Sequence, residues 1–252
     1  MNFLSLKNRA LHVLIGSAAL LLLTAQDASA YKVSPLHHYL TLTGKGATSS
    51  MVITNSHDYP LTVEMTVERR ELSGGKVTQD VPADDDFLIF PPQAIIQPGK
   101  KQRVQIRYVG DAVDVSELYR LIVVQVPVSL ADDDTAQVNV AYNFVSAVYV
   151  APSGAKADIV VSDIKPSAAG GFDVTVRNEG NYHALLPDFK WTGSDGSQNA
   201  VLSPADLPLG EEPFIEPGGQ RVVSLPRKAL GELRTLSSLK ITQGKDSKKR
   251  SR

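Results

Sequence analysis

Histidine, aspartate and serine are the residue types of this chain that could support metal binding or hydrolysis. Of the five histidines, His12 belongs to an N-terminal export signal that is described below. His37 and His38 are adjacent on a predicted strand, where neighbouring side chains point to opposite faces, so they cannot share a metal ion. His57 falls in a predicted turn and His183 in a loop much later in the chain. The histidines therefore predict no metal site.

Two runs of three aspartates, at residues 84–86 and 132–134, supply carboxylates without the pattern of a calcium loop. Such a loop needs oxygen ligands at alternate positions and a glutamate at its end, so we expect two solvated loops instead. The chain shows no glycine-rich phosphate loop and no nucleophile elbow, and no pattern brings a serine, a histidine and an acid together. We predict that the protein is not an enzyme and uses no metal and no cofactor.

The charge and the cysteine content exclude further classes of protein. The formal net charge is −1, and it becomes −2 when Lys7, Arg9 and Asp27 are removed with the export signal. A nearly neutral protein is not expected to bind nucleic acid or an anionic membrane as its main partner. Because the chain has no cysteine, neither disulfides nor thiolate metal sites can stabilise it, and the hydrophobic core must do so alone.

The first 30 residues have the three parts of a secretory signal peptide. Lys7 and Arg9 form a basic start, an apolar segment follows at residues 13–24, and Ala28-Ser29-Ala30 is a small-residue cleavage site. The apolar segment is shorter than the ~20 residues that cross a bilayer as a helix. We expect export, cleavage after Ala30 and no membrane insertion of the mature chain.

The segment at residues 87–110 is the most informative guide to the fold. A short apolar strand, Phe87–Phe90, runs into Pro91-Pro92, and a second apolar stretch ends at the turn Pro98-Gly99. The strand that follows alternates strictly between apolar and polar residues. Its apolar face is Val104, Ile106 and Tyr108, and its polar face is Arg103, Gln105 and Arg107. Three strands in so short a window predict an antiparallel sandwich.

Further strand patterns surround this segment and continue after a break. Apolar or alternating runs at residues 50–55, 61–69, 118–128 and 137–150 are separated by Gly, Pro and Asp turns. About seven strands at this spacing are typical of an immunoglobulin-like sandwich. We therefore predict a first domain at residues 31–152.

A second and smaller β domain is predicted after the linker Pro152-Ser153-Gly154. Strand patterns restart there at residues 159–161 and 172–178 and recur up to residues 239–241. We assign this domain to residues 155–244 and a basic polar tail to residues 245–252. The predicted fold class is all-β, with two immunoglobulin-like β-sandwich domains.

The strand at residues 136–150 has an unusual first half. Its last third is apolar on both faces and is expected in the core, whereas its first part alternates medium-sized apolar side chains with amides. The apolar set is Ala136, Val138, Val140, Tyr142 and Phe144. Considered alone, this pattern indicates a strand that is half buried in its own sheet.

The order of these parts resembles the PapD-like family of periplasmic pilus-assembly chaperones. The resemblance rests on the Pro-Pro step, the Pro-Gly turn and the basic alternating strand within residues 87–110, and on Asn178-Glu179-Gly180-Asn181 in the second domain. It also rests on Glu117-Leu118-Tyr119-Arg120-Leu121, whose Tyr-Arg pair is similar to one that recurs in the alternate and archaic chaperone–usher branches. The resemblance covers nearly all of the mature chain.

The resemblance implies a function. In this family the last strand of the first domain is lent to an unfinished pilus subunit and completes its sandwich, which is donor-strand complementation. The strand that starts at residue 136 would then bind the subunit, and the partners would be pilus (fimbrial) subunits and an outer-membrane usher in the periplasm. At ~1.5–3 kcal/mol per buried apolar side chain, four or five such side chains could hold a subunit without a nucleotide.

The chain departs from the commonest branch of the family at the carboxylate anchor. That branch binds the subunit's C-terminal carboxylate with an Arg of the first strand and a Lys of the donor strand. The matching positions fall near Tyr39 and Val145, and neither residue is basic. The resemblance to other branches implies Arg120 as the anchor and Arg107 as the second candidate, because a guanidinium donates two parallel hydrogen bonds to a carboxylate. A surface or interdomain salt bridge is the alternative role of Arg120.

Two other classes of exported protein are open alternatives. A structural or adhesive pilus subunit would also have sandwich domains, but it would lack its own final strand and often carry a cysteine pair. An exported sandwich hydrolase or lectin would need a polar or aromatic cluster. The single tryptophan, Trp191, and the scattered tyrosines do not form such a cluster in the sequence.

Overall fold

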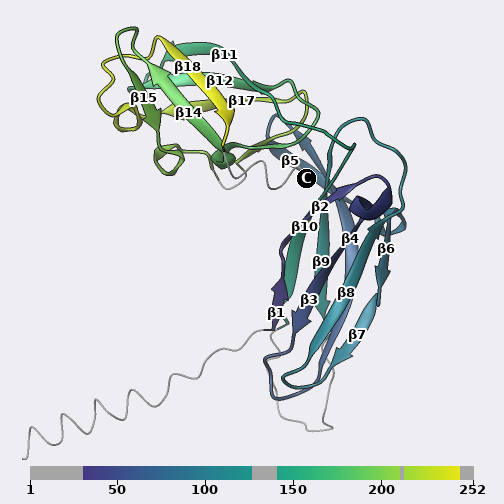
Figure 1. Ribbon diagram of the computed structural model, residues 1–252. Coiled ribbons are helices and arrows are strands. Elements are labelled where there is room, and N and C mark those ends of the chain that lie inside the picture. Colours follow the sequence, from purple (N-terminus) through teal and green to yellow (C-terminus); the bar gives the residue numbers. More distant parts are fainter. Residues whose placement is uncertain (1–30, 127–140, 211–212, 245–252) are drawn as a thin grey trace, which may run out of the picture.

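The computed structural model describes residues 31–126, 141–210 and 213–244, and these residues form two β-sandwiches that meet at an angle (Figure 1). The helical segments among the described residues are short 3-10 turns. They are η2 (Gly44–Ala47), η3 (Asp84–Asp86), η4 (Leu186–Asp188), η5 (Pro204–Asp206) and η6 (Arg227–Leu230). The prediction of an all-β protein with two sandwiches is confirmed.

The first sandwich packs two sheets face to face. One sheet has the order β1 (Lys32–Ser34), β3 (Thr48–Thr54), β8 (Lys101–Tyr108) and β6 (Phe87–Phe90). The other has the order β2 (His37–Thr41), β10 (Asn143–Ala151), β9 (Glu117–Gln125), β4 (Leu61–Ser73) and β5 (Lys76–Pro82), and β7 (Gln93–Ile96) also pairs with β4. The chain crosses from one sheet to the other at every connection in this domain except β4–β5 and β9–β10.

Period-two alternation builds the core of this sandwich. Strand β8 buries Val104, Ile106 and Tyr108 and turns its basic and amide residues outward, as the sequence predicted. Strand β4 contributes a second alternating set from the facing sheet, Leu61, Val63, Met65 and Val67. Burial of such side chains stabilises the fold by ~1.5–3 kcal/mol each, which a chain without cysteine requires.

The aspartates at residues 84–86 were predicted to form a solvated loop, but two of them also accept hydrogen bonds from other strands. They form η3, in which Asp84 Oδ1 accepts a hydrogen bond from the Val67 N–H at 2.8 Å. Asp86 Oδ2 accepts one from the Tyr119 hydroxyl at 3.1 Å. The prediction was therefore incomplete, because the carboxylates satisfy donors of β4 and β9 that lie far away in the sequence. The second run, residues 132–134, lies outside the described residues.

The second sandwich consists of three small sheets. Their orders are β11 (Ile159–Pro166), β12 (Phe172–Asn178) and β17 (Gln220–Leu225); β13 (Ala184–Leu185) and β16 (Phe214–Ile215); and β15 (Asn199–Leu202), β14 (Phe189–Ser194) and β18 (Ser238–Gln243). Fully buried Trp191 lies in the core of this sandwich, and its indole N–H donates to the Leu186 carbonyl at 3.3 Å. This core contains none of the side chains that form the first one.

Candidate functional site

Strand β10 has a neighbour on both sides along only part of its length. It pairs antiparallel with β9 from Asn143 to Val150, whereas its parallel pairing with β2 begins at Ala147, opposite His37. Between Asn143 and Ser146, the described residues therefore place a strand on one side of β10 only. An edge of this kind presents unpaired backbone groups to which a further strand can add.

The predicted subunit-binding residues lie at and beyond this edge. Ala136, Val138 and Val140 fall outside the described residues. Tyr142 is 41% exposed, and Phe144 is half-buried with its ring edge-on to Tyr31, the centroids 4.7 Å apart.

The same face of β10 continues into the core of its own domain. The next side chains of this parity, Ser146, Val148 and Val150, are all buried. Tyr31 connects β9 to the residue before β10, since its hydroxyl lies 2.9 Å from the carbonyl oxygens of both Val123 and Tyr142. The apolar side chains of this parity thus leave the core at half-buried Phe144, and exposed Tyr142 lies directly before β10. Of the strand expected at residues 136–150, the described residues form a strand only from Asn143 onward.

The outer face of this sheet carries the first anchor candidate, Arg120. The registers of β9, β10 and β2 align Arg120, Ala147 and His37 in one row across three strands. Side chains directly opposite each other in such a row have Cβ atoms about 5 Å apart. Because Ala147 carries only a methyl group, β10 places no long side chain between those of Arg120 and His37.

Arg120 is also ion-paired within its own domain. Its Nη1 lies 2.7 Å from Asp80 Oδ2 and 3.0 Å from Glu68 Oε2. Arg70 holds the same Asp80 carboxylate through Nε and Nη2 at 2.9 and 3.1 Å, and Arg70 and Arg120 together lower the pKa of Asp80. The salt-bridge role considered from the sequence is therefore observed. Since 26% of the Arg120 side chain is exposed, it can still meet a ligand.

The second anchor candidate, Arg107, lies on the other sheet. It is on β8, opposite Leu88 of β6 and Thr48 of β3, and its side chain is exposed. The two arginines thus lie on opposite outer faces of the sandwich and cannot share one ligand. Only Arg120 belongs to the sheet that contains β10.

Tyr39 and Val145, near which the resemblance located the common anchor, are not cross-strand neighbours. The register of β2 and β10 puts Tyr39 opposite Tyr149 instead. The two rings are stacked, with centroids 5.4 Å apart and planes 9° from parallel. An aromatic pair therefore occupies the outer face at the end of β10 nearest the second domain.

Hydrogen bonds join the two domains beside this pair. The Ser116 N–H donates to the Asn181 carbonyl at 2.9 Å, and the Ser116 hydroxyl oxygen accepts from the His183 N–H at 2.8 Å. The same hydroxyl lies 2.6 Å from His183 Nδ1. Because both residues are buried, this serine–histidine contact holds the two domains together and does not present a nucleophile to a substrate. On the hairpin between β4 and β5, the Gly75 N–H donates to the Glu216 carboxylate at 3.1 Å.

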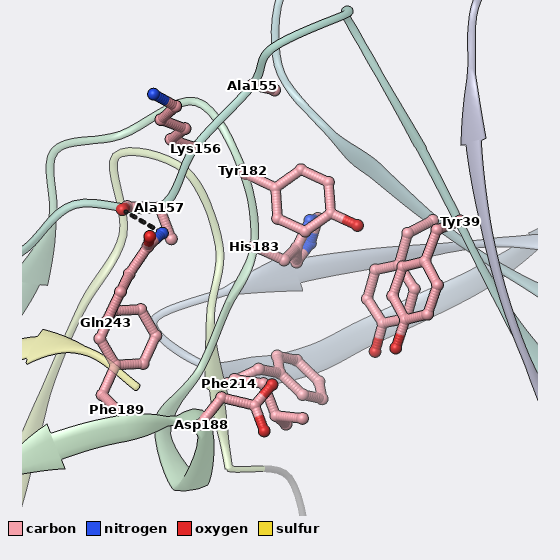
Figure 2. A pocket seen from close by; sticks show the side chains of 12 residues that line it. Tyr39, Ala155, Lys156, Ala157, Tyr182, His183, Asp188, Phe189, Phe214 and Gln243 are labelled. Atoms are coloured by element: carbon pink, nitrogen blue, oxygen red, sulfur yellow. Dashed lines mark hydrogen bonds between the residues drawn. The ribbon is translucent and has the colours of Figure 1, made fainter. Parts of the chain in front are cut away.

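An interdomain pocket opens at this junction (Figure 2). Five of its twelve lining residues are tyrosine or phenylalanine, and the lining also includes one lysine, one aspartate and one histidine. The walls are formed by Tyr39, Tyr149, Ala155, Lys156, Ala157, Tyr182, His183, Leu185, Asp188, Phe189, Phe214 and Gln243. The stacked tyrosines come from the first domain, and Tyr182, His183 and Phe214 face them from the second.

This pocket was missed by the sequence analysis. The adjacent pair Tyr182-His183 after the turn at Asn181 is the one signal that could have indicated it. The tyrosines and phenylalanines that form the cluster come from segments up to 175 positions apart, between Tyr39 and Phe214, and no local pattern links them. Domain docking alone brings them together.

Two buried histidines predict how stability depends on pH. Burial lowers the pKa of both His38 and His183 from 6.5 to about 4, and the charge of His37 adds to the effect on His38. Below pH 6.5 the unfolded chain binds these protons before the folded chain does. The free energy of unfolding should therefore fall between pH 6.5 and about 4, by up to ~3 kcal/mol per histidine.

Urea unfolding at several pH values checks this expectation. The urea midpoint should drop steadily from pH 7 to pH 4.5, and His38→Asn and His183→Asn should each flatten part of that slope. A slope that is identical in both variants and in the unchanged protein would show that other groups cause the pH dependence.

Within the three described ranges, no group of three or more His, Cys, Asp or Glu side chains is arranged to hold a metal ion. The same residues include no helix that is long and apolar enough to span a bilayer. The site is therefore built from a strand edge, an arginine with its acidic partners and an aromatic pocket.

Comparison with known proteins gives a family for the first domain. Residues 33–156 match the family described as pili and flagellar-assembly chaperone, PapD N-terminal domain. No curated protein matches this sequence.

Solved structures of the same architecture cover most of the chain. The class 5 fimbriae chaperone CfaA has a TM-score of 0.56 at 13% identity, over 85% of this chain and 99% of its own. The E. coli chaperone DraB has a TM-score of 0.53 at 16% identity, over 86% and 97%. A chain of the CsuC–CsuE chaperone–tip adhesion subunit complex, from the archaic chaperone–usher Csu pili of Acinetobacter baumannii, has 0.52 at 13% identity, over 85% and 93%. At these identities the likeness establishes the two-domain fold.

Proposed function

Because this chain belongs to the PapD-like family of pilus chaperones, which are not enzymes, we propose that it protects unfinished pilus subunits by donor-strand complementation and delivers them to an outer-membrane usher. The observation that carries the proposal is the open edge of β10. Upstream of Ala147, this strand lacks a second neighbour among the described residues, and the exposed Tyr142 directly precedes its first residue. A subunit that lacks one strand offers the complementary groove.

The proposed binding strand is the apolar set Ala136, Val138, Val140, Tyr142 and Phe144. Insertion of these side chains would bury apolar surface on both partners, and the backbone groups of the strand would pair with the subunit's edges. The prediction that the protein is not an enzyme is confirmed by the family.

Arg120 is the proposed anchor of the subunit's terminal carboxylate, with Arg107 as the second candidate. Arg120 lies in the strand next to β10, on the outer face beside Ala147, whereas Arg107 lies on the far sheet. The acidic partners of Arg120 orient its guanidinium, and their charge also disfavours an unspecific anion. An incoming carboxylate would share Arg120 with Asp80 and Glu68 or displace one of them.

We also propose where the functional unit begins and ends. The signal at residues 1–30 would be removed during export to the periplasm, the chaperone domain would comprise residues 31–152, and the smaller domain residues 155–244. Tyr31 supports this start, because the first residue after the proposed cleavage site is only 1% exposed and belongs to the first core. The two separate cores support a boundary in the linker.

Co-expression with a candidate pilus subunit from the same organism tests the proposed function. The subunit should be recovered from periplasmic extracts as a soluble one-to-one complex, and it should be degraded or aggregated when the chaperone is omitted. Delivery is tested by adding the complex to membranes that contain the usher. A subunit that stays soluble at the same level without this protein would contradict the proposal.

A further inference from the structure

Strand β6 is an edge strand without the usual protection against pairing. It is the last strand of the sheet β1-β3-β8-β6, so among the described residues no strand lies on its side away from β8. Its four residues, Phe87–Phe90, are all apolar. Edge strands are commonly protected by charged side chains, and β1, the other edge of this sheet, carries the exposed Lys32. The uncharged edge of β6 is therefore a site to which another strand can add.

The outward side chains of β6 are unusually exposed. Phe90 has 70% of its surface accessible, the highest fraction of any large apolar residue that the structure describes, and Leu88 has 58%. Phe87 points the other way and belongs to the core, against which Ile89 packs. Leu88 and Phe90 thus bury little surface in this fold. Their burial against a second molecule would favour association.

The backbone of Ile89 is directed to the free edge. In an antiparallel ladder, alternate residues exchange hydrogen bonds with one neighbour, and the residues between them point their N–H and C=O to the other side. The Asp86 carbonyl accepts from the Val109 N–H at 2.9 Å, which puts Asp86, Leu88 and Phe90 on the β8 side of this alternation. The N–H and C=O of Ile89 therefore face away from β8.

A second copy of β6 is complementary to this edge. When a twofold axis passes between the two copies of Ile89, their N–H and C=O groups exchange two hydrogen bonds. This register sets Leu88 of each copy opposite Phe90 of the other, on the same outer face. Because the arrangement is symmetric, each copy supplies both members of the apolar pair. Pro91-Pro92 ends the pairing after Phe90 and keeps the contact short.

Charged residues at the two ends of β6 are complementary in the same register. Exposed Asp85 of η3 precedes the strand, and exposed Arg103 lies on β8 two positions before Gln105, the partner of Phe90. The symmetric register carries η3 of one copy past Phe90 of the other, toward its Arg103. Within the part of the chain that the structure describes, neither Asp85 nor Arg103 has an ion pair. Two such acid–base contacts then flank the apolar pairs.

We propose that two copies of this protein associate through antiparallel pairing of their β6 edges, which joins their two four-stranded sheets into one. β6 lies on the opposite side of the first sandwich from β10, so the dimer leaves both subunit-binding edges open (Figure 1). The chain is nearly neutral, so its net charge opposes this association little. The dimer goes beyond the proposed function and does not require a bound subunit.

Sedimentation velocity of the full-length protein, over a roughly 100-fold range of micromolar concentrations, tests the dimer. The unchanged protein should shift from monomer to dimer within this range. Leu88→Lys and Phe90→Lys should each raise the dissociation constant about tenfold or more, because a charge on an edge strand opposes pairing. Both side chains are exposed, so the variants should melt like the unchanged protein.

The matched control is Val201→Lys. Val201 is 62% exposed and lies on β15, an edge strand of the second sandwich, so this variant adds the same charge to a similar position away from β6. It should change the dissociation constant by less than about twofold.

Exchange of the two charges tests the register. Asp85→Arg and Arg103→Asp should each weaken the dimer about fivefold or more, because like charges then meet at two symmetric places. The protein with both substitutions has opposite charges at these places again. It should recover most of the affinity, a result that no general change in net charge produces.

Four results would overturn the proposal. The first is a protein that stays monomeric throughout the concentration range. The second is a dimer that Leu88→Lys and Phe90→Lys leave intact. The third is a double charge variant that dimerises no better than the single ones. The fourth is a dimer that Tyr142→Lys abolishes, which would place the contact at the β10 edge instead.

Discussion

An aspartate at Val138, Val140 or Tyr142 is expected to abolish recovery of the pilus subunit from the periplasm. The carboxylate would enter an apolar groove of the subunit with no partner for its charge, which costs several kcal/mol and corresponds to a loss in affinity of more than about 100-fold. Tyr142 is the most direct position, since its side chain is 41% exposed and its replacement does not disturb the core. The measurement is the amount of subunit that co-purifies with each variant.

A matched control separates this effect from damage to the fold. Val222 is an exposed strand residue of the second domain, with 59% of its surface accessible, so Val222→Asp introduces the same charge away from β10. It should leave subunit recovery unchanged. All variants should melt within a few degrees of the unchanged protein. Normal subunit recovery with all three donor-strand variants would reject donor-strand complementation as the binding mode.

Arg120→Ala should weaken subunit capture by about 30-fold or more. A terminal carboxylate that is buried against the sheet loses its charge partner in this variant, and truncating one member of such a pair typically costs ~2–5 kcal/mol. Arg120→Lys should retain part of the affinity, because an ammonium group supplies the charge but not the two parallel hydrogen bonds. Titration of the chaperone with a peptide that ends in the subunit's C-terminal sequence, with a free or an amidated terminus, measures the effect directly.

The ion pairs of Arg120 require two controls. Arg70→Ala removes the other guanidinium that binds Asp80, so it tests whether loss of the ion-pair network is enough to impair binding. It should lower stability slightly and leave the preference for a free carboxylate intact. Arg107→Ala should have no effect, because Arg107 lies on the opposite sheet. If Arg107→Ala impairs binding and Arg120→Ala does not, Arg107 is the anchor. If neither Arg107→Ala nor Arg120→Ala impairs binding, the apolar strand recognises the subunit alone.

The strands and their faces were predictable from the sequence because strand signals are local. Alternation in β8 and β4, and the Pro-Gly turn before β8, depend on residues within a few positions of each other. The buried face of each strand then follows from the alternation of side chains. The same local patterns, taken in order, also led to the family that residues 33–156 match.

The predictions for residues 84–86 and for the anchor were less complete, because both depend on contacts between residues far apart in the sequence. Asp84 binds the Val67 N–H, and Arg120 binds Asp80, 40 positions away in the sequence. Such pairs depend on the register between strands, which many side chains set together when they are buried. Sequence analysis could name Arg120 as an anchor or a salt bridge, but it could not show that the same guanidinium lies beside Ala147.

The sequence by itself therefore determined the all-β class, the alternating faces of its strands and the basic character of the tail. Tertiary structure decided which residues share a surface. It set Arg120, Ala147 and His37 in one row, separated Arg107 from them, and gathered Tyr39, Tyr149, Tyr182 and Phe214 around a pocket. The physical reason is the range of the interactions: turn chemistry and alternation act over a few residues, whereas strand register and domain docking follow from burial across the whole chain.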